Sequence, residues 1–135
     1  MNHQEIAEIL DQAARHARPT TQLAAAHQID LDAAYQIQNL CVGKKLDRGE
    51  YVTGYKLGFT NRARMEEMGV HDLIWGVLTN SMEILNQEEV DAKRWILPRA
   101  EVEIAFRISQ DIEESVGLKD ITYYIDKVAP AIEIV

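Results

Sequence analysis

The stretch AEVEIAF, residues 100–106, decides the fold that we expect for this chain. Residues 101–108 alternate in character, and successive side chains of a β-strand point to opposite faces. The apolar face, which can pack on a core, consists of Val102, Ile104, Phe106 and Ile108. The opposite face carries Glu101 and Glu103, whose Cβ atoms should lie about 6.5 Å apart at the usual rise of a strand.

A third acid, Glu133, lies in a second apolar stretch, APAIEIV, residues 129–135. A buried strand does not tolerate an unpaired carboxylate cheaply, so three acids in two apolar strands suggest a shared partner. Carboxylate oxygens are suitable ligands for a hard divalent cation such as Mg²⁺ or Mn²⁺. Glu-x-Glu is also common on solvated strand faces, and Arg107 can form an ordinary exposed ion pair with Glu103. The spacing alone leaves both interpretations open.

The composition limits the class of protein. A chain of 135 residues is long enough for one domain with a real core. Its net charge of −8 argues against nucleic acid and anionic membranes as partners, because both require a basic surface. The charge does not argue against a small acidic substrate, since a bound divalent cation reverses the local sign. The sequence has neither a signal-type segment nor a membrane-length apolar run, so we expect a cytoplasmic protein.

The patterning predicts an α+β fold with two regions, an α/β region at residues 1–80 and a second region at residues 81–135. Helices are expected at residues 3–17, 32–48 and 61–68 and from Asp120 to Pro130. Strands are expected at residues 51–60, 82–85 and 95–97 and around Glu133, and a loop at residues 70–80 is expected to run into a further short strand. Asp11 belongs to the polar side of the first helix. Cys41 lies in the apolar pattern of the second, which favours a buried inert thiol over a nucleophile.

Lys56 lies in the strand expected at residues 51–60, between Gly54 and Gly58. A glycine inside a strand often marks the close approach of a ligand or of another backbone. Lys56 is therefore a candidate buried amine, although a lysine that protects an edge strand from aggregation explains the pattern more simply. Asp72 belongs to the following loop, where contact with a substrate is the less favoured interpretation.

The chain ends at Val135, inside an apolar stretch that reads as a strand. We expect that residues 1–135 are part of a longer polypeptide, or that further strands come from elsewhere. Bare apolar strand edges pair with other chains, so we expect oligomerisation or poor solubility for an isolated chain of this length.

Several stretches, in the same order, resemble the 2-oxopent-4-enoate hydratase and 4-oxalocrotonate decarboxylase family of the fumarylacetoacetate hydrolase superfamily. They are DLDAAYQIQ at residues 30–38, GYKLGFTNRARMEEMGV at residues 54–70 followed by Trp75-Gly76, PRAEVEIAF at residues 98–106 and VAPAIEIV at residues 128–135. The resemblance extends from about residue 30 onward and corresponds to the N-terminal half of the family. It implies that a small helical region is followed by the start of a mixed β-roll.

The resemblance also implies the chemistry. Glu101, Glu103 and Glu133 would bind Mg²⁺ or Mn²⁺, and Lys56 would line the site as an acid, a base or a charge-stabilising group, with Gly58 and Asp72 on the substrate side. The substrate would be a 2-oxo-alkenoate or 2-hydroxydienoate from the catabolism of aromatic compounds. A homo-oligomer is expected, or a complex with a partner hydratase or decarboxylase.

One position departs from the pattern. Hydratases of the family usually read Pro-Asp-[Phe or Tyr]-Gly, where this chain has Leu73-Ile74-Trp75-Gly76, so the aspartate is replaced by Ile74. This replacement favours a decarboxylase over a 2-keto-4-pentenoate hydratase, although Asp72 can compensate. Two more functions fit the sequence less closely: a C–C bond hydrolase of the superfamily, and a non-catalytic chain that serves as an assembly partner.

Overall fold

The computed structural model describes residues 1–86, 88–113 and 115–135, which form a mixture of helices and strands, as the α+β prediction requires. The chain divides into two compact units, Met1–Ile96 and Leu97–Val135. The division into domains after residue 80 stays a prediction. Within the described residues, no helix has the length and apolar character that are needed to cross a membrane.

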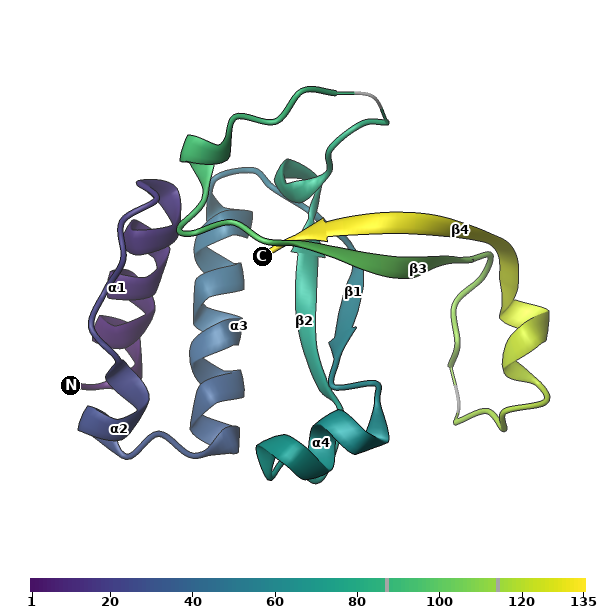
Figure 1. Ribbon diagram of the computed structural model, residues 1–135, viewed down its shortest axis with the longest axis horizontal. Helices are drawn as coiled ribbons and strands as arrows, with labels where there is room; N and C mark the ends of the chain where they lie inside the picture. Colours follow the sequence, from purple (N-terminus) through teal and green to yellow (C-terminus); the bar gives the residue numbers. More distant parts are fainter. Residues whose placement is uncertain (87, 114) are drawn as a thin grey trace. The chain divides into compact units, whose positions relative to one another are not determined.

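The first unit begins with the helices α1 (His3–Arg15), α2 (Leu23–His27) and α3 (Leu31–Asp47). The helices α1 and α3 lie side by side (Figure 1), and they enclose a small core of Ile6, Ala7 and Ile37. Each helix has an N-cap residue whose side chain accepts a hydrogen bond from a backbone N–H of the first turn, Asn2 for α1 and Asp30 for α3.

The same unit contains an antiparallel pair of strands, β1 (Val52–Gly58) and β2 (Ile74–Thr79), with α4 (Arg62–Met68) between them in the chain. The helix α4 ends at Gly69, whose φ of 65° is a left-handed conformation that glycine adopts without steric cost. The register places Lys56 directly opposite Gly76.

The second unit is an antiparallel ribbon of β3 (Ala100–Ile108) and β4 (Ile125–Ile134), and the short 3-10 helix η3 (Ile121–Tyr124) comes directly before β4. The expected helix from Asp120 to Pro130 is therefore wrong beyond its first turn. Residues 125–134 form a strand because they pair with β3, and this non-local pairing overrides a helix-like spacing of apolar residues. Pro130 is tolerated because β4 has one paired neighbour among the described strands, and an edge strand does not need every N–H.

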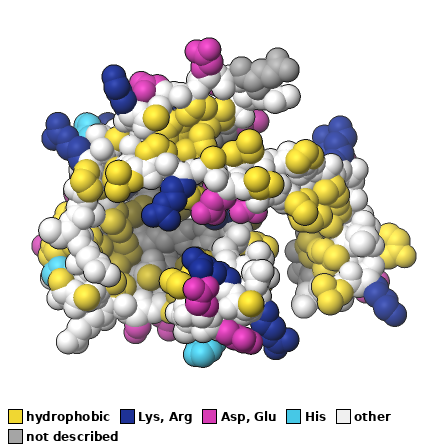
Figure 2. Space-filling view, in the orientation of Figure 1, with side chains coloured by type: hydrophobic (Ala, Val, Ile, Leu, Met, Phe, Trp, Pro, Cys, Tyr) yellow, Lys and Arg dark blue, Asp and Glu magenta, His cyan; other side chains and the backbone are white. Residues whose placement is uncertain are grey.

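Two further expectations about strands and burial are wrong. Residues 82–85 and 95–97 form no strand in the described structure; the regular elements nearby are the 3-10 helices η1 (Asn80–Met82) and η2 (Ala92–Arg94). The apolar face of the ribbon does not pack on a core, since Val102 is 89% exposed and its cross-strand partner Ile132 is 72% exposed. Hydrophobic side chains accordingly reach the surface of this unit (Figure 2).

Candidate metal centre

The ribbon brings three acids together on its polar face. Glu101 and Glu103 lie two residues apart on β3, and the register places Glu133 of β4 directly opposite Glu101. Each side chain offers one carboxylate oxygen, and these three oxygens all lie within 4.8 Å of one another. Glu101 is exposed, whereas Glu103 and Glu133 are half-buried. The structure thus brings the three carboxylates together, and their role as metal ligands stays a prediction.

Glu101 and Glu133 face each other across the ribbon, and like charges directly opposite each other disfavour strand pairing. A hard divalent cation removes the penalty, and three carboxylate oxygens are the ligands that Mg²⁺, Mn²⁺ and Ca²⁺ accept. The next positions on the same face are small: Ala131 lies opposite Glu103, and Ala105 lies opposite Ala129. These alanine side chains are small and take up little room on the face that carries the acids.

Arg107, which shares this face of β3, does not pair with Glu103, so the exposed ion pair that we considered is wrong. Its guanidinium Nε donates to Asp126 Oδ1 at 2.8 Å, and an Nη2 contact to Asp126 Oδ2 makes the pair bidentate. This hydrogen bonding raises the pKa of Arg107 and lowers the pKa of Asp126. The arginine is therefore engaged at the far end of the ribbon.

The other predicted site residues belong to the first unit. Lys56 is half-buried on β1. Gly58 has a packing explanation, because a Cβ at this position would lie 2.8 Å from the Ile74 side chain. Asp72 is an exposed loop residue whose carboxylate accepts a hydrogen bond from the Leu73 N–H at 2.7 Å. The three glutamates belong to the second unit. A role in catalysis or substrate binding stays a prediction for Lys56, Gly58 and Asp72.

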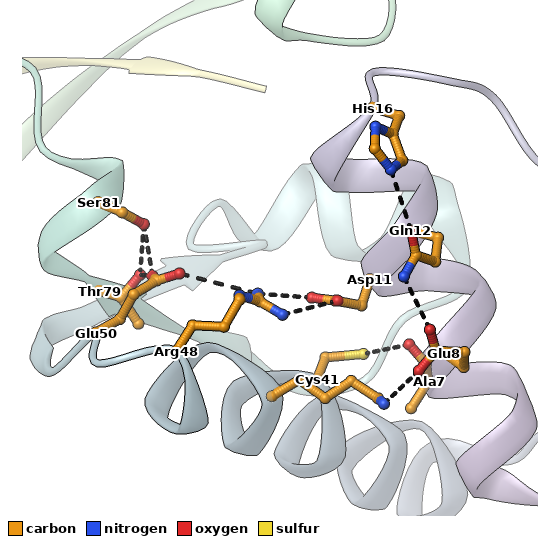
Figure 3. A network of polar contacts seen from close by, with 11 residues as sticks. Ala7, Glu8, Asp11, Gln12, His16, Cys41, Arg48, Glu50, Thr79 and Ser81 are labelled. Carbon is orange, nitrogen blue, oxygen red and sulfur yellow. Dashed lines mark hydrogen bonds and ion pairs between the residues drawn. The ribbon is translucent and has the colours of Figure 1, made fainter.

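A polar network in the first unit has a structural role (Figure 3). Arg48 of α3 makes a bidentate contact with Asp11 of α1, at 2.8 and 2.9 Å, and lies 3.9 Å from Glu50. Glu50 in turn accepts hydrogen bonds from the hydroxyls of Thr79, at 2.7 Å, and Ser81. The network therefore joins both helices to the end of β2. Asp11 is only 5% exposed, so its assignment to the polar side of the first helix is wrong.

Sequence reasoning missed two residues of α3 that contact β2. The Tyr35 hydroxyl accepts a hydrogen bond from the Trp75 N–H at 3.3 Å, and the Gln38 amide contacts both Trp75 and Val77. The available signal was their spacing, because residues three apart lie on the same side of a helix.

Comparison with known proteins gives a consistent set of relatives. The chain is 37% identical to a 4-oxalocrotonate decarboxylase of Pseudomonas sp over 135 residues, which is all of this chain and 53% of that protein. It is 35% identical over 130 residues to a 2-hydroxyhexa-2,4-dienoate hydratase of Comamonas testosteroni, covering 93% of this chain and 49% of that enzyme. The chain spans about half the length of the curated relatives it matches.

A solved structure has the same fold over nearly the whole chain. The 4-oxalocrotonate decarboxylase from Pseudomonas putida G7, complexed with magnesium and adipate, matches with a TM-score of 0.91 and 26% identity, covering 98% of this chain and 51% of that one. The same enzyme complexed with calcium and acetate matches equally well. No family model matches the sequence. By sequence and by fold, the chain is a homologue of the 4-oxalocrotonate decarboxylases and 2-keto-4-pentenoate hydratases, matched over its own length and over about half of theirs.

Proposed function

We propose that this chain carries the metal-binding part of a divalent-metal-dependent lyase that acts on 2-oxo-alkenoates or 2-hydroxydienoates in the catabolism of aromatic compounds. The observation that carries the proposal is the convergence of three carboxylate oxygens within 4.8 Å in a chain whose solved relatives are complexed with magnesium or calcium. We assign Glu101, Glu103 and Glu133 as ligands of one Mg²⁺ or Mn²⁺.

The ligands of the solved relatives support the substrate class. The decarboxylase from Pseudomonas putida G7 is complexed with adipate in one structure and with acetate in the other, and both are carboxylates. The net charge of −8 does not argue against an acidic substrate where a bound cation reverses the local sign. The cluster of Glu101, Glu103 and Glu133 would hold such a cation.

A divalent cation bound there would supply positive charge opposite the negative charge that develops on the substrate's 2-oxo group as CO₂ leaves. The three glutamates would hold and orient that charge. Lys56 would move a proton or stabilise negative charge, and Gly58 and Asp72 would contact the substrate. Decarboxylation is favoured over hydration because Ile74 stands where hydratases of the family carry an aspartate.

Hydratase activity is the second candidate. The 35% identity to a 2-hydroxyhexa-2,4-dienoate hydratase favours it, and it is close to the 37% identity to the decarboxylase. Asp72, an exposed carboxylate two residues before Ile74, would then handle the proton or water.

The finer fold is part of the same proposal. We infer that β3 and β4 are strands of a mixed β-roll of the fumarylacetoacetate hydrolase type, in a homo-oligomer or in a complex with a partner hydratase or decarboxylase. The exposed apolar face of the ribbon supports this assignment, because the exposed side chains need a covering partner in water.

Two measurements test the proposal. Calorimetric titration of the chain with Mn²⁺ and with Mg²⁺ should show one site, whose affinity falls strongly when Glu103 is replaced by glutamine. Incubation with 4-oxalocrotonate and with 2-hydroxypenta-2,4-dienoate, each with and without metal, should show metal-dependent release of CO₂ from the former. Consumption of the latter without CO₂ release would identify a hydratase, and the absence of metal binding would refute the assigned site.

A further inference from the structure

The side chain of Lys56, on β1, lies next to Gly76 of the neighbouring strand β2. Gly76 lies directly opposite it in the register. A Cβ built at Gly76 would lie 3.3 Å from Cγ and 3.7 Å from Cδ of Lys56. A side chain at position 76 would therefore crowd the aliphatic stem of the lysine, which would have to shift by a few tenths of an ångström.

The backbone on both sides of Gly76 is held by one side chain of α3. The Gln38 amide Nε2 donates to the Trp75 carbonyl at 3.4 Å, and its Oε1 accepts from the Val77 N–H at 3.2 Å. A side-chain amide thus makes the contacts that a neighbouring strand would make with an edge strand. The Gln38 Oε1 also lies 3.6 Å from the position of a Cβ at Gly76.

Tyr35 holds the same segment from one turn earlier on α3. Its hydroxyl accepts a hydrogen bond from the Trp75 N–H at 3.3 Å. Its ring stacks on the Trp75 ring, with 5.0 Å between the ring centroids. Because Tyr35 and Gln38 hold β2 at Trp75 and Val77, the strand cannot move away from Lys56 without breaking these contacts.

We infer that Gly76 and Gln38 are positioning residues for the Lys56 ammonium group. Gly76 leaves room for the lysine stem, and Gln38 holds the strand on which that stem lies. This inference rests on the proposed function for the part that Lys56 plays in the reaction. Small displacements of a reacting group reduce rates strongly, so the geometry at Gly76 would affect turnover more than substrate binding.

The test compares Gly76→Ala with Gly54→Ala. Gly54 lies two residues before Lys56 on β1, and a Cβ there would meet no atom within 4 Å, which makes it a matched control. The acetylation rate of each lysine is measured by mass spectrometry after trace labelling with acetic anhydride across a range of pH. Lys93, on η2, serves as the internal reference.

We expect Gly76→Ala to change the acetylation rate of Lys56 several-fold, with the rate at Lys93 unchanged. We expect Gly54→Ala to change neither. In the enzyme assay, Gly76→Ala should lower kcat by about tenfold with little change in KM. An unchanged acetylation profile of Lys56 in a folded Gly76→Ala variant overturns the inference.

Gln38→Glu provides a second variant for the case in which Gly76→Ala does not fold. It keeps the acceptor for the Val77 N–H and loses the donor to the Trp75 carbonyl, so it should change the Lys56 profile in the same way. Gln36→Glu, at an exposed position of α3, is its control. Altered labelling with unaltered turnover would support the positioning of Lys56 and refute its proposed part in the reaction, so the two claims fail separately.

Discussion

Replacing Glu103 by glutamine is expected to stabilise the metal-free chain and to weaken its response to a divalent cation. The oxygens of Glu101, Glu103 and Glu133 lie within 4.8 Å of one another, and two unit charges at that distance repel by about 0.9 kcal/mol at the dielectric constant of water. At an effective dielectric constant of about 20 the same pair repels by about 3.5 kcal/mol. Glu101 is exposed whereas Glu103 and Glu133 are half-buried, so the repulsion lies between these two values, nearer to the value for water.

Glu103 takes part in two of the three repulsive pairs, so at 4.8 Å and the dielectric constant of water the substitution removes about 1.8 kcal/mol of repulsion. We expect the free energy of unfolding to rise by about 1 kcal/mol in a chelating buffer, since the side chains relax apart. With a divalent cation present, the wild type is expected to become more stable than Glu103→Gln. A cation at a hundred times its Kd adds about 2.7 kcal/mol to the wild type, whereas a variant whose Kd is about a hundredfold higher gains only about 0.4 kcal/mol.

The assay is urea unfolding followed by circular dichroism, at low ionic strength because salt screens the repulsion. Each chain is measured with EDTA and with Mn²⁺. Glu66→Gln, which removes an exposed acid on α4, is the control and should show neither effect. A Glu103→Gln chain that is less stable without metal, or that gains as much from Mn²⁺ as the wild type, would show that the three carboxylates do not form one cation site.

Three further expectations concern the first unit. The pKa of Glu50 is lowered overall. Desolvation is the largest single influence and raises this pKa, but the hydrogen bonds from Ser81 and Thr79 and the nearby cations together outweigh it. Its ionised form therefore contributes stability that is lost as pH falls through the lowered value, and Glu50→Gln should flatten the decline in urea midpoint between about pH 6 and 3. Arg48→Leu leaves the buried Asp11 without its bidentate partner and should lower the free energy of unfolding in urea by about 3 kcal/mol. A variant as stable as the wild type would contradict this expectation. Burial, and then the nearby Asp11 carboxylate, raises the pKa of the Cys41 thiol, so iodoacetamide should alkylate it slowly in the native chain and rapidly in urea; equal rates would contradict the burial.

Local patterning was sufficient for the parts of the site that lie on one strand. The alternation of residues 101–108 places Glu101 and Glu103 on one face of β3 whatever the strand pairs with, because the side-chain period of a strand is two. The same kind of argument identified α4 and its end at Gly69, since capping depends on residues within one turn.

Local patterning misled where a contact reaches across the chain. Ile121, Ile125 and Val128 have a helical spacing, but pairing with β3 makes residues 125–134 a strand. Asp11 follows the polar pattern of α1, but Arg48, 37 residues later, holds it in a buried ion pair. Neither outcome is encoded in the neighbouring residues.

The sequence by itself determined which residues share a strand face or a helix turn, because those relations follow from backbone geometry over a few residues. It also determined the family resemblance, through motifs that occur in one order. Only the tertiary structure decided that Glu133 stands opposite Glu101 and that Lys56 lies across Gly76. Both relations depend on the register between strands, and register is a non-local property: a shift of one residue would turn each of these side chains to the opposite face.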